Sequence, residues 1–454
     1  MSKFFSSFKK DTTISENEIS YEFHEKILSS SILYGLALLC IIWGSVRSLR
    51  YIKKCTTKRE KIEASISTRK ALKFPVIASI VLFSLYVLIK CDSECRDKVY
   101  DKGEQYLPEV ILDKINEGNK QYQKLIGFFK QSDEINDNNL IEPKTANDKI
   151  RYFFNNTLRP MFNRENFFCA LLVLLCYEGV FALANIFNPF LSPIYKIITL
   201  NFFKKINYRI KFDSGTKAMT DKEAEEAPEE NWKKTSEIFY DNHYLLSLLI
   251  FTYISLHHVL QRHWITNNLI GVSFSIIGIE VLHLSSYKAG CILLMGLFFY
   301  DIFWVFGTDV MTTVAKSIDA PILLQFPQDI LRNGWMAKNY SMIGLGDIVI
   351  PGIFIALLYR FDNREYLLGN NQPKRYFYFI VTIISYAIGL FMTIGIMHIF
   401  KKAQPALLYL VPCCIIIPYT IASIRGEGKE LWNYNEERFI DPEKEDTYFE
   451  KKKV

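Results

Sequence analysis

The sequence predicts an all-α polytopic membrane protein with nine transmembrane helices. Half of its 454 residues are hydrophobic, and they gather in runs close to the roughly 20 residues that cross about 30 Å of hydrocarbon. The charged residues, 22% of the chain, lie mainly in the connectors between these runs. Two of the runs carry an aspartate, Asp301 and Asp347, at intramembrane depth, where a charged side chain usually serves a function.

Nine runs are long enough to span the bilayer. In chain order they are Ile27–Val46, Phe74–Cys91, Asn166–Ile186, Tyr244–Leu260, Trp264–Leu284, Ala289–Phe306, Met342–Tyr359, Tyr376–Phe400 and Pro405–Ile424. A tenth apolar run, Phe190–Phe203, is short and interrupted by Pro193 and Lys196, so it is predicted to be an interfacial segment.

The basic residues of the connectors predict the orientation. The connector Arg47–Lys73 holds ten Lys and Arg residues, which places it in the cytosol by the positive-inside rule. With nine spans, the N-terminus is then lumenal and the C-terminus cytosolic. The connector after the seventh span, with Arg360, Arg364, Lys374 and Arg375, falls on the cytosolic side as well, whereas Lys401 and Lys402 disagree mildly.

The connectors divide the chain into five regions. The predicted regions are 1–91, the lumenal N-terminus with two spans; 92–165, a lumenal insertion; 166–260, spans three and four with a charged cytosolic loop at 204–242; 261–424, spans five to nine with both aspartates; and 425–454, a cytosolic tail. Within the charged loop, Asp213–Glu237 has no apolar period and is predicted to be flexible.

Three short signals lie in these connecting regions. Asn155 begins an N-glycosylation sequon, which is usable if the insertion is lumenal. Cys91 and Cys95 are four residues apart at a membrane edge and leave a local disulfide open. Lys451 and Lys452 occupy the positions of a dilysine signal for retrieval to the endoplasmic reticulum, with a solvated basic tail as the alternative.

A pair of intramembrane carboxylates is suited to hydrolysis of a peptide bond. Two carboxylates a few Å apart share one proton, so one activates a water molecule while the other protonates the departing group. Asp301 and Asp347 lie on consecutive spans, which run antiparallel, and each lies about 12 residues from the cytosolic end of its span. A proton or ion pathway, or a structural hydrogen bond, is the alternative for such a pair. Gly344 and Gly346 favour the hydrolytic reading because they leave backbone uncovered for another chain to approach.

Three motifs resemble the signatures of the presenilin-type intramembrane aspartyl proteases, with the signal-peptide-peptidase branch as the closer match. They are Tyr300-Asp301, Gly344-Leu345-Gly346-Asp347 and Gln404-Pro405-Ala406-Leu407. The resemblance continues through nearly contiguous text from Arg262 to Pro412, which makes it very specific.

The resemblance implies a nine-span protease with a lumenal N-terminus in the endoplasmic reticulum membrane. Its substrates would be signal peptides left by signal peptidase and other type II-oriented transmembrane segments. Asp301 and Asp347 would be the catalytic pair; Tyr300, Gly344, Leu345, Gly346, Pro405, Ala406 and Leu407 would shape the site and hold substrate. No cofactor or metal is implied, the partners would be substrate peptides and membrane lipid, and a homo-oligomer is expected.

Other classes lack their motifs. The chain has no His-Glu-x-x-His for a zinc protease, no Gly-x-Ser-Gly for a rhomboid-like serine protease, and no nucleic-acid-binding pattern. Presenilin itself is disfavoured by the predicted orientation and by the short loop between the two aspartate-bearing spans. An ion-conducting or substrate-holding protein without proteolytic turnover remains the alternative.

Overall fold

The computed structural model describes residues 16–58, 62, 64–90, 164–198, 207–214, 233–308, 310–311, 314, 320–333, 339–368, 373–400 and 404–436. The chain forms two compact units. The larger unit comprises residues 1–77, 172–308 and 320–454 and contains both aspartates; the smaller comprises residues 78–171 and 309–319.

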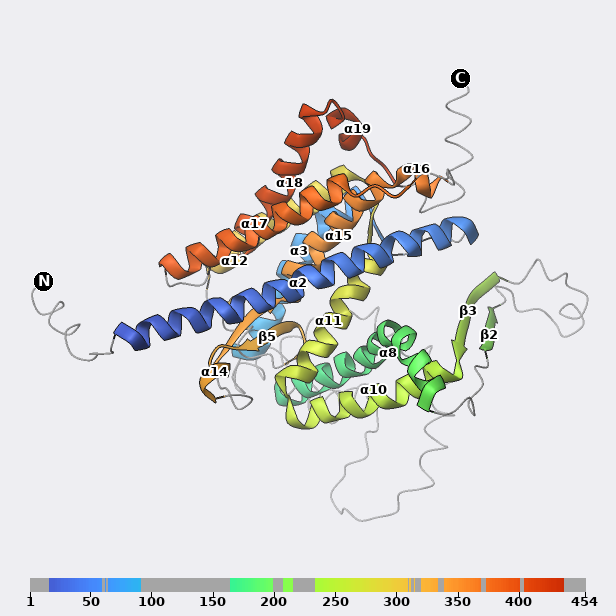
Figure 1. Cartoon of the computed structure of the whole chain (residues 1–454), viewed down its shortest axis with the longest axis horizontal. Coiled ribbons are helices and arrows are strands. Elements are labelled where there is room, and N and C mark those ends of the chain that lie inside the picture. The colour runs from blue at the N-terminus through green and yellow to red at the C-terminus, as the bar shows by residue number, and fades with distance from the viewer. Residues whose placement is uncertain are drawn as a thin grey trace, which may run out of the picture. The chain divides into compact units, whose positions relative to one another are not determined.

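Eight helices in the described part of the chain are long and apolar enough to cross a membrane (Figure 1). They are α2 (Glu16–Lys58), α3 (Thr68–Lys90), α8 (Arg164–Ile198), α10 (Asn242–Gln261), α11 (Trp264–Val281), α12 (Tyr287–Phe306), α17 (Phe377–Phe400) and α18 (Leu407–Ile424). α15 (Leu345–Asp362) has the same length as α18 but carries three charged residues, Asp347, Arg360 and Asp362. Every predicted run therefore overlaps a helix, and a crossing by all nine stays a prediction.

Polar caps define where several of these helices begin. Asp241 Oδ1 accepts a hydrogen bond from the backbone N–H of Tyr244 (2.6 Å) at the start of α10, and Ser286 Oγ accepts one from Ala289 N–H (3.1 Å) at the start of α12. Between α10 and α11, Arg262 adopts the left-handed conformation with φ of 49°. These caps make the connections between spans four, five and six short and well defined.

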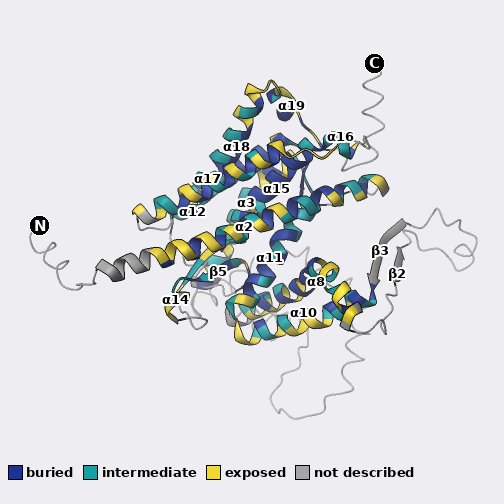
Figure 2. Cartoon of the chain, in the orientation of Figure 1, coloured by how far each residue is buried: buried dark blue, intermediate teal, exposed yellow. Residues whose placement is uncertain are grey.

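α15 is the central helix of the larger unit. It contacts α2, α11, α12, α17 and α18, and all residues from Pro351 to Phe361 are buried (Figure 2). A helix that is apolar on all faces belongs in the interior. Small residues allow close packing here, since a Cβ added at Gly44 of α2 or Gly352 of α15 would lie within 2.8 or 2.5 Å of the Ile279 side chain of α11.

The structure corrects the predicted start of α15. Met342–Tyr359 was predicted to be one helix, but the residues before Leu345 form strand β6 (Tyr340–Gly344). β6 pairs antiparallel with β5 (Leu323–Pro327), with Leu323 opposite Gly344. A short apolar run reads equally well as a strand or a helix, so only the pairing with β5 decides.

The prediction of a flexible loop at Asp213–Glu237 is wrong at both ends of that segment. Strands β2 (Asn207–Ser214) and β3 (Lys233–Asp241) form an antiparallel ladder that extends into the predicted flexible segment 213–237. The ladder pairs Tyr208 with Tyr240 and Ile210 with Ile238, an alternating apolar pattern that lies just outside the charged run.

The predicted interruption at Pro193 is wrong, because α8 continues without a break through Pro189 and Pro193 to Ile198, whereas an interfacial position for residues 190–203 stays a prediction. Two side-chain contacts attach this extension to α10: Ser192 Oγ lies 2.7 Å from His243 Nδ1, and Tyr195 OH lies 3.1 Å from Ser247 Oγ. Tertiary packing thus overrides the local effect of the two prolines.

The remaining elements are short. They are the parallel pair β1 (Ser65–Ile66) and β4 (His283–Leu284), and the helices α14 (Ile330–Asn333), α16 (Arg364–Leu367) and α19 (Gly428–Trp432).

Candidate active site

Asp301 lies on α12 and is almost fully buried, with 4% of its surface exposed. Its Oδ2 atom accepts a hydrogen bond from the backbone N–H of Leu407, at 3.0 Å. Leu407 is the first residue of α18, where backbone N–H groups have no partner within the helix. The start of α18 therefore supplies a donor that orients the Asp301 carboxyl group.

Asp347 lies in the first turn of α15, directly after β6. The positive end of the helix dipole favours a carboxylate at this position. A Cβ added at Gly344 would lie 3.4 Å from Asp347 Oδ2, whereas nothing lies within 4 Å of one added at Gly346. The backbone carbonyl of Asp347 accepts a hydrogen bond from the hydroxyl of Tyr386 on α17, at 3.1 Å. Tyr386 thus anchors the backbone of the first turn of α15, and the glycines on either side of Leu345 leave space beside the Asp347 side chain.

The two aspartates lie close enough for their carboxyl groups to interact electrostatically. Among the described residues, no cation forms an ion pair with either one. Two carboxyl groups held this close favour one shared proton over two negative charges. This arrangement suits acid and base catalysis by the two members of one dyad.

The hairpin that leads into Asp347 is fixed by asparagines of α11. Asn267 Nδ2 donates to the carbonyl of Leu323 (2.7 Å), and Asn268 exchanges two hydrogen bonds with the backbone of Gln325 (2.6 and 2.8 Å). On the other strand, Ser341 Oγ lies 2.8 Å from Ser29 Oγ of α2. Asn267, Asn268 and Tyr386 were not predicted as site residues, although two adjacent asparagines inside an apolar span are a usable signal.

The other predicted site residues fall into two groups. Gly344, Leu345 and Gly346 form the junction of β6 and α15, where Leu345 N–H donates to the carbonyl of Ile322 at 3.1 Å. Pro405, Ala406 and Leu407 form the entry to α18, but Pro405 lies before the helix rather than in its first turn as predicted.

Tyr300 stands apart from both groups. Its ring is half-buried and packs against Trp304, with the ring centres 6.4 Å apart. No hydrogen bond joins Tyr300 to another described residue, so its role in the site rests on the motif alone.

Several predictions fall outside the described residues. They concern the insertion at 92–165, of which only Arg164 and Glu165 are described as the start of α8, with Asn155, the pair Cys91 and Cys95, and the terminal Lys451 and Lys452. Within the described ranges, no group of three or more His, Cys, Asp or Glu side chains is arranged to hold a metal ion.

Comparison with known proteins matches this architecture to one family. The model of the signal peptide peptidase family matches residues 57–438. The chain is 46% identical over 447 residues to intramembrane protease 2 of Caenorhabditis elegans, an alignment that covers 94% of each protein. It is 37% identical to the signal peptide peptidase of Mus musculus and 36% identical to that of Homo sapiens, each over 90% of this chain and 83% of the relative. No solved structure matches the chain significantly.

Proposed function

Because the chain belongs to the signal peptide peptidase family, we propose that Asp301 and Asp347 are the catalytic dyad with which it cleaves transmembrane segments inside the bilayer. The protein is an intramembrane aspartyl protease, and signal peptides are its substrates. The observation that supports the dyad best is the pairing of two carboxyl groups that share no cation and lie against the N-termini of two helices, α15 and α18.

The dyad performs the hydrolysis in two steps, the addition of water to the peptide carbonyl and the cleavage of the C–N bond. The ionised carboxylate takes a proton from a water molecule, whose oxygen attacks the carbonyl carbon of the scissile peptide bond, while the protonated carboxyl group donates its proton to the carbonyl oxygen. The carboxyl group that took the proton from water then donates it to the amide nitrogen, while the other carboxylate takes a proton from a hydroxyl of the tetrahedral intermediate as the C–N bond breaks, which restores the dyad. The Leu407 N–H donates to one oxygen of Asp301 and leaves the other free to face Asp347 and the water.

The junction of β6 and α15 suits the binding of an extended substrate. A helical substrate hides its amide bonds, so it must unwind before cleavage. Gly346 is exposed, and its position has no side chain within 4 Å, so an extended backbone can approach the Asp347 carboxyl group there. Leu345 and Ala406 border the same site as small or apolar neighbours, and Tyr300 and Pro405 complete the motifs.

The cellular setting is proposed from the sequence. The protein is a multi-pass membrane protein, and we place it in the endoplasmic reticulum with its N-terminus in the lumen and its C-terminus in the cytosol. Asn155 is then available for glycosylation, and Lys451 and Lys452 for retrieval. The boundaries 1–91, 92–165, 166–260, 261–424 and 425–454 are retained as proposed regions. A homo-oligomer surrounded by membrane lipid is the proposed assembly.

Cleavage of a defined substrate tests the dyad. The full-length protein in detergent is incubated with a labelled transmembrane peptide derived from a signal peptide, beside Asp301→Ala and Asp347→Ala. We expect internal cleavage by the wild type alone, with mass spectrometry locating the scissile bond. Equal cleavage by all three proteins would identify a contaminating protease and remove the assignment of the dyad.

A further inference from the structure

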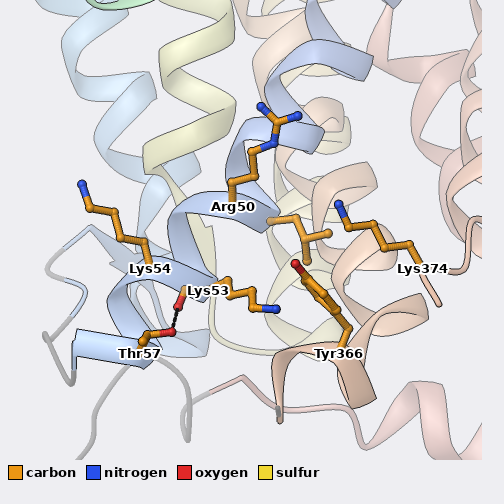
Figure 3. Close-up of a pocket in the computed structure, with 7 residues that line it drawn as sticks. Arg50, Lys53, Lys54, Thr57, Tyr366 and Lys374 are labelled. Carbon is orange, nitrogen blue, oxygen red and sulfur yellow. Dashed lines mark hydrogen bonds between the residues drawn. The ribbon is translucent and has the colours of Figure 1, made fainter. Parts of the chain in front are cut away.

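A basic cavity lies at the C-terminal end of α2 (Figure 3). Tyr34, the α2 residue that interacts electrostatically with Asp347, lies 16 residues before Arg50. Its volume of about 390 Å³ is within the range of roughly 300–1,000 Å³ typical of small-molecule sites. The cavity brings together two segments more than 300 residues apart in sequence. Its polar lining consists of Arg50, Lys53, Lys54, Thr57, Tyr366 and Lys374.

Two of the cations, Lys53 and Lys374, approach one aromatic ring (Figure 3). Lys53 Nζ lies 3.3 Å from the centre of the Tyr366 ring, and Lys374 Nζ approaches the same ring to 5.4 Å. A hydrogen bond from Lys53, together with the charges of Lys53, Lys374 and Arg50, lowers the pKa of the Tyr366 hydroxyl. The environment of this hydroxyl therefore favours a negative charge.

The four cations of the cavity differ from the arginines nearby. Arg47, Arg360 and Arg364 are each paired with a glutamate, at 2.6 to 2.9 Å. By contrast, no ion pair joins Arg50, Lys53, Lys54 or Lys374 to a carboxylate within the part of the chain that the structure describes. Four positive charges in one cavity repel one another unless an anion compensates them.

The cavity lies where lipid headgroups would be. The apolar run of α2 ends at Val46, four residues before Arg50, and the span of α17 begins at Phe377, three residues after Lys374. Both segments that line the cavity are therefore at the boundary between hydrocarbon and water. The positive-inside rule places both on the cytosolic side, where anionic lipids are concentrated.

We propose that this cavity binds the phosphate of an anionic lipid headgroup through Lys53, Lys374 and Arg50, with the Tyr366 ring packed beside the two lysines and Lys54 at the edge of the cavity. This binding site is separate from the dyad and does not depend on the proteolytic function. The shared chemistry is recognition of a phosphate, and the position at the membrane boundary selects a phospholipid rather than a soluble phosphate.

Native mass spectrometry of the full-length protein in neutral detergent tests the proposal. The protein is titrated with phosphatidylinositol 4-phosphate, with phosphatidylcholine of the same acyl chains, and with inorganic phosphate. Each cation near a phosphate strengthens binding about fivefold, so Lys53→Gln/Lys374→Gln is expected to weaken binding of the anionic lipid by roughly thirtyfold. The control Lys70→Gln/Lys429→Gln removes two exposed lysines outside the cavity and should stay within about twofold of wild type.

Each outcome decides the assignment. The proposal is supported if only Lys53→Gln/Lys374→Gln weakens binding of phosphatidylinositol 4-phosphate, and if binding of phosphatidylcholine does not change. Equal lipid binding by all variants would overturn it, and so would inorganic phosphate that binds as tightly as the lipid, since that result assigns the cavity to a soluble ligand. If the double variant does not fold, Lys374→Gln, which changes an exposed residue outside the helices, is expected to show the fivefold loss by itself.

Discussion

The charged residues at the two ends of α15 differ in whether an opposite charge compensates them. At the N-terminal end, Asp347 is half-buried beside a second carboxyl group, and no described cation pairs with it. At the C-terminal end, Arg360 is fully buried and its Nε donates to both carboxylate oxygens of Glu436, at 2.9 and 3.1 Å, while Nη1 donates to Ser48 Oγ at 2.8 Å.

This difference suggests that Arg360 has a structural role, whereas we propose a catalytic role for Asp347. The Arg360–Glu436 pair attaches the segment after α19 to the central helix, and its charges compensate each other. No described cation compensates the aspartates, which is consistent with the proposal that they exchange a proton with substrate and water.

The largest expected effect is at the uncompensated end. Asp301→Asn and Asp347→Asn should each lower the rate of peptide cleavage at least about 10³-fold, because neither amide can serve as acid or base. Their thermal midpoints should equal or exceed that of the wild type, since the cost of burying an ionisable carboxyl group is removed and no ion pair between described residues is lost. Cleavage and thermal unfolding in detergent measure both. A large fall in the midpoint would show that the aspartates are structural.

Substitutions at the Arg360–Glu436 pair should have the reverse effect, lowering stability without a specific loss of cleavage. Glu436→Gln leaves Arg360 buried without its counter-charge, which destabilises the fold by about 3–5 kcal/mol. Arg360→Met/Glu436→Leu should recover much of this loss, because the double change removes both charges. Unfolding by denaturant in detergent measures the two variants. Cleavage per folded molecule should stay close to wild type, and a specific loss of turnover would contradict the structural assignment.

A histidine beside the buried pair makes the same end sensitive to acid. Burial, followed by the charge of Arg360, lowers the pKa of His283 to about 3 from the 6.5 of a free histidine. Between these two values the unfolded chain binds a proton that the folded chain does not, so stability falls as the pH decreases.

The expected loss at His283 is about 2 kcal/mol between pH 6.5 and about pH 5, at 1.36 kcal/mol per pH unit. Unfolding measured across this range in wild type and His283→Asn isolates the contribution of this residue. The free energy of unfolding of the variant should depend less steeply on pH than that of the wild type. Identical slopes for the two proteins would show that His283 does not cause the acid sensitivity.

The smallest effect on cleavage is expected from Tyr386, which contacts the backbone of Asp347 and not its carboxyl group. Tyr386→Phe removes the hydrogen bond to the Asp347 carbonyl, which contributes about 1 kcal/mol to stability and positions the first turn of α15. We expect a severalfold loss of cleavage. Tyr195→Phe is the matched control, because it removes a hydrogen bond to Ser247 on α10 and should lower stability alone. Equal activity losses in both variants would mean that Tyr386 acts only through stability.

The sequence by itself determined the spans, the two aspartates and the family. Apolar runs of membrane length are a local property, and each of the nine overlaps a helix. A carboxylate inside such a run is conspicuous without knowledge of its neighbours, as Asp301 and Asp347 show. The motifs around Tyr300, Gly344 and Pro405 were sufficient to predict the family that the comparisons confirm.

Only the tertiary structure decided how these residues are held. Whether Tyr340–Gly344 is a strand depends on its partner β5, and the donor to Asp301 comes from Leu407, 106 residues away. Arg360 and Glu436 are 76 residues apart, so no local pattern pairs them. Apolar runs are a local property of the sequence. These hydrogen bonds and ion pairs join residues that only the packing of the helices brings together.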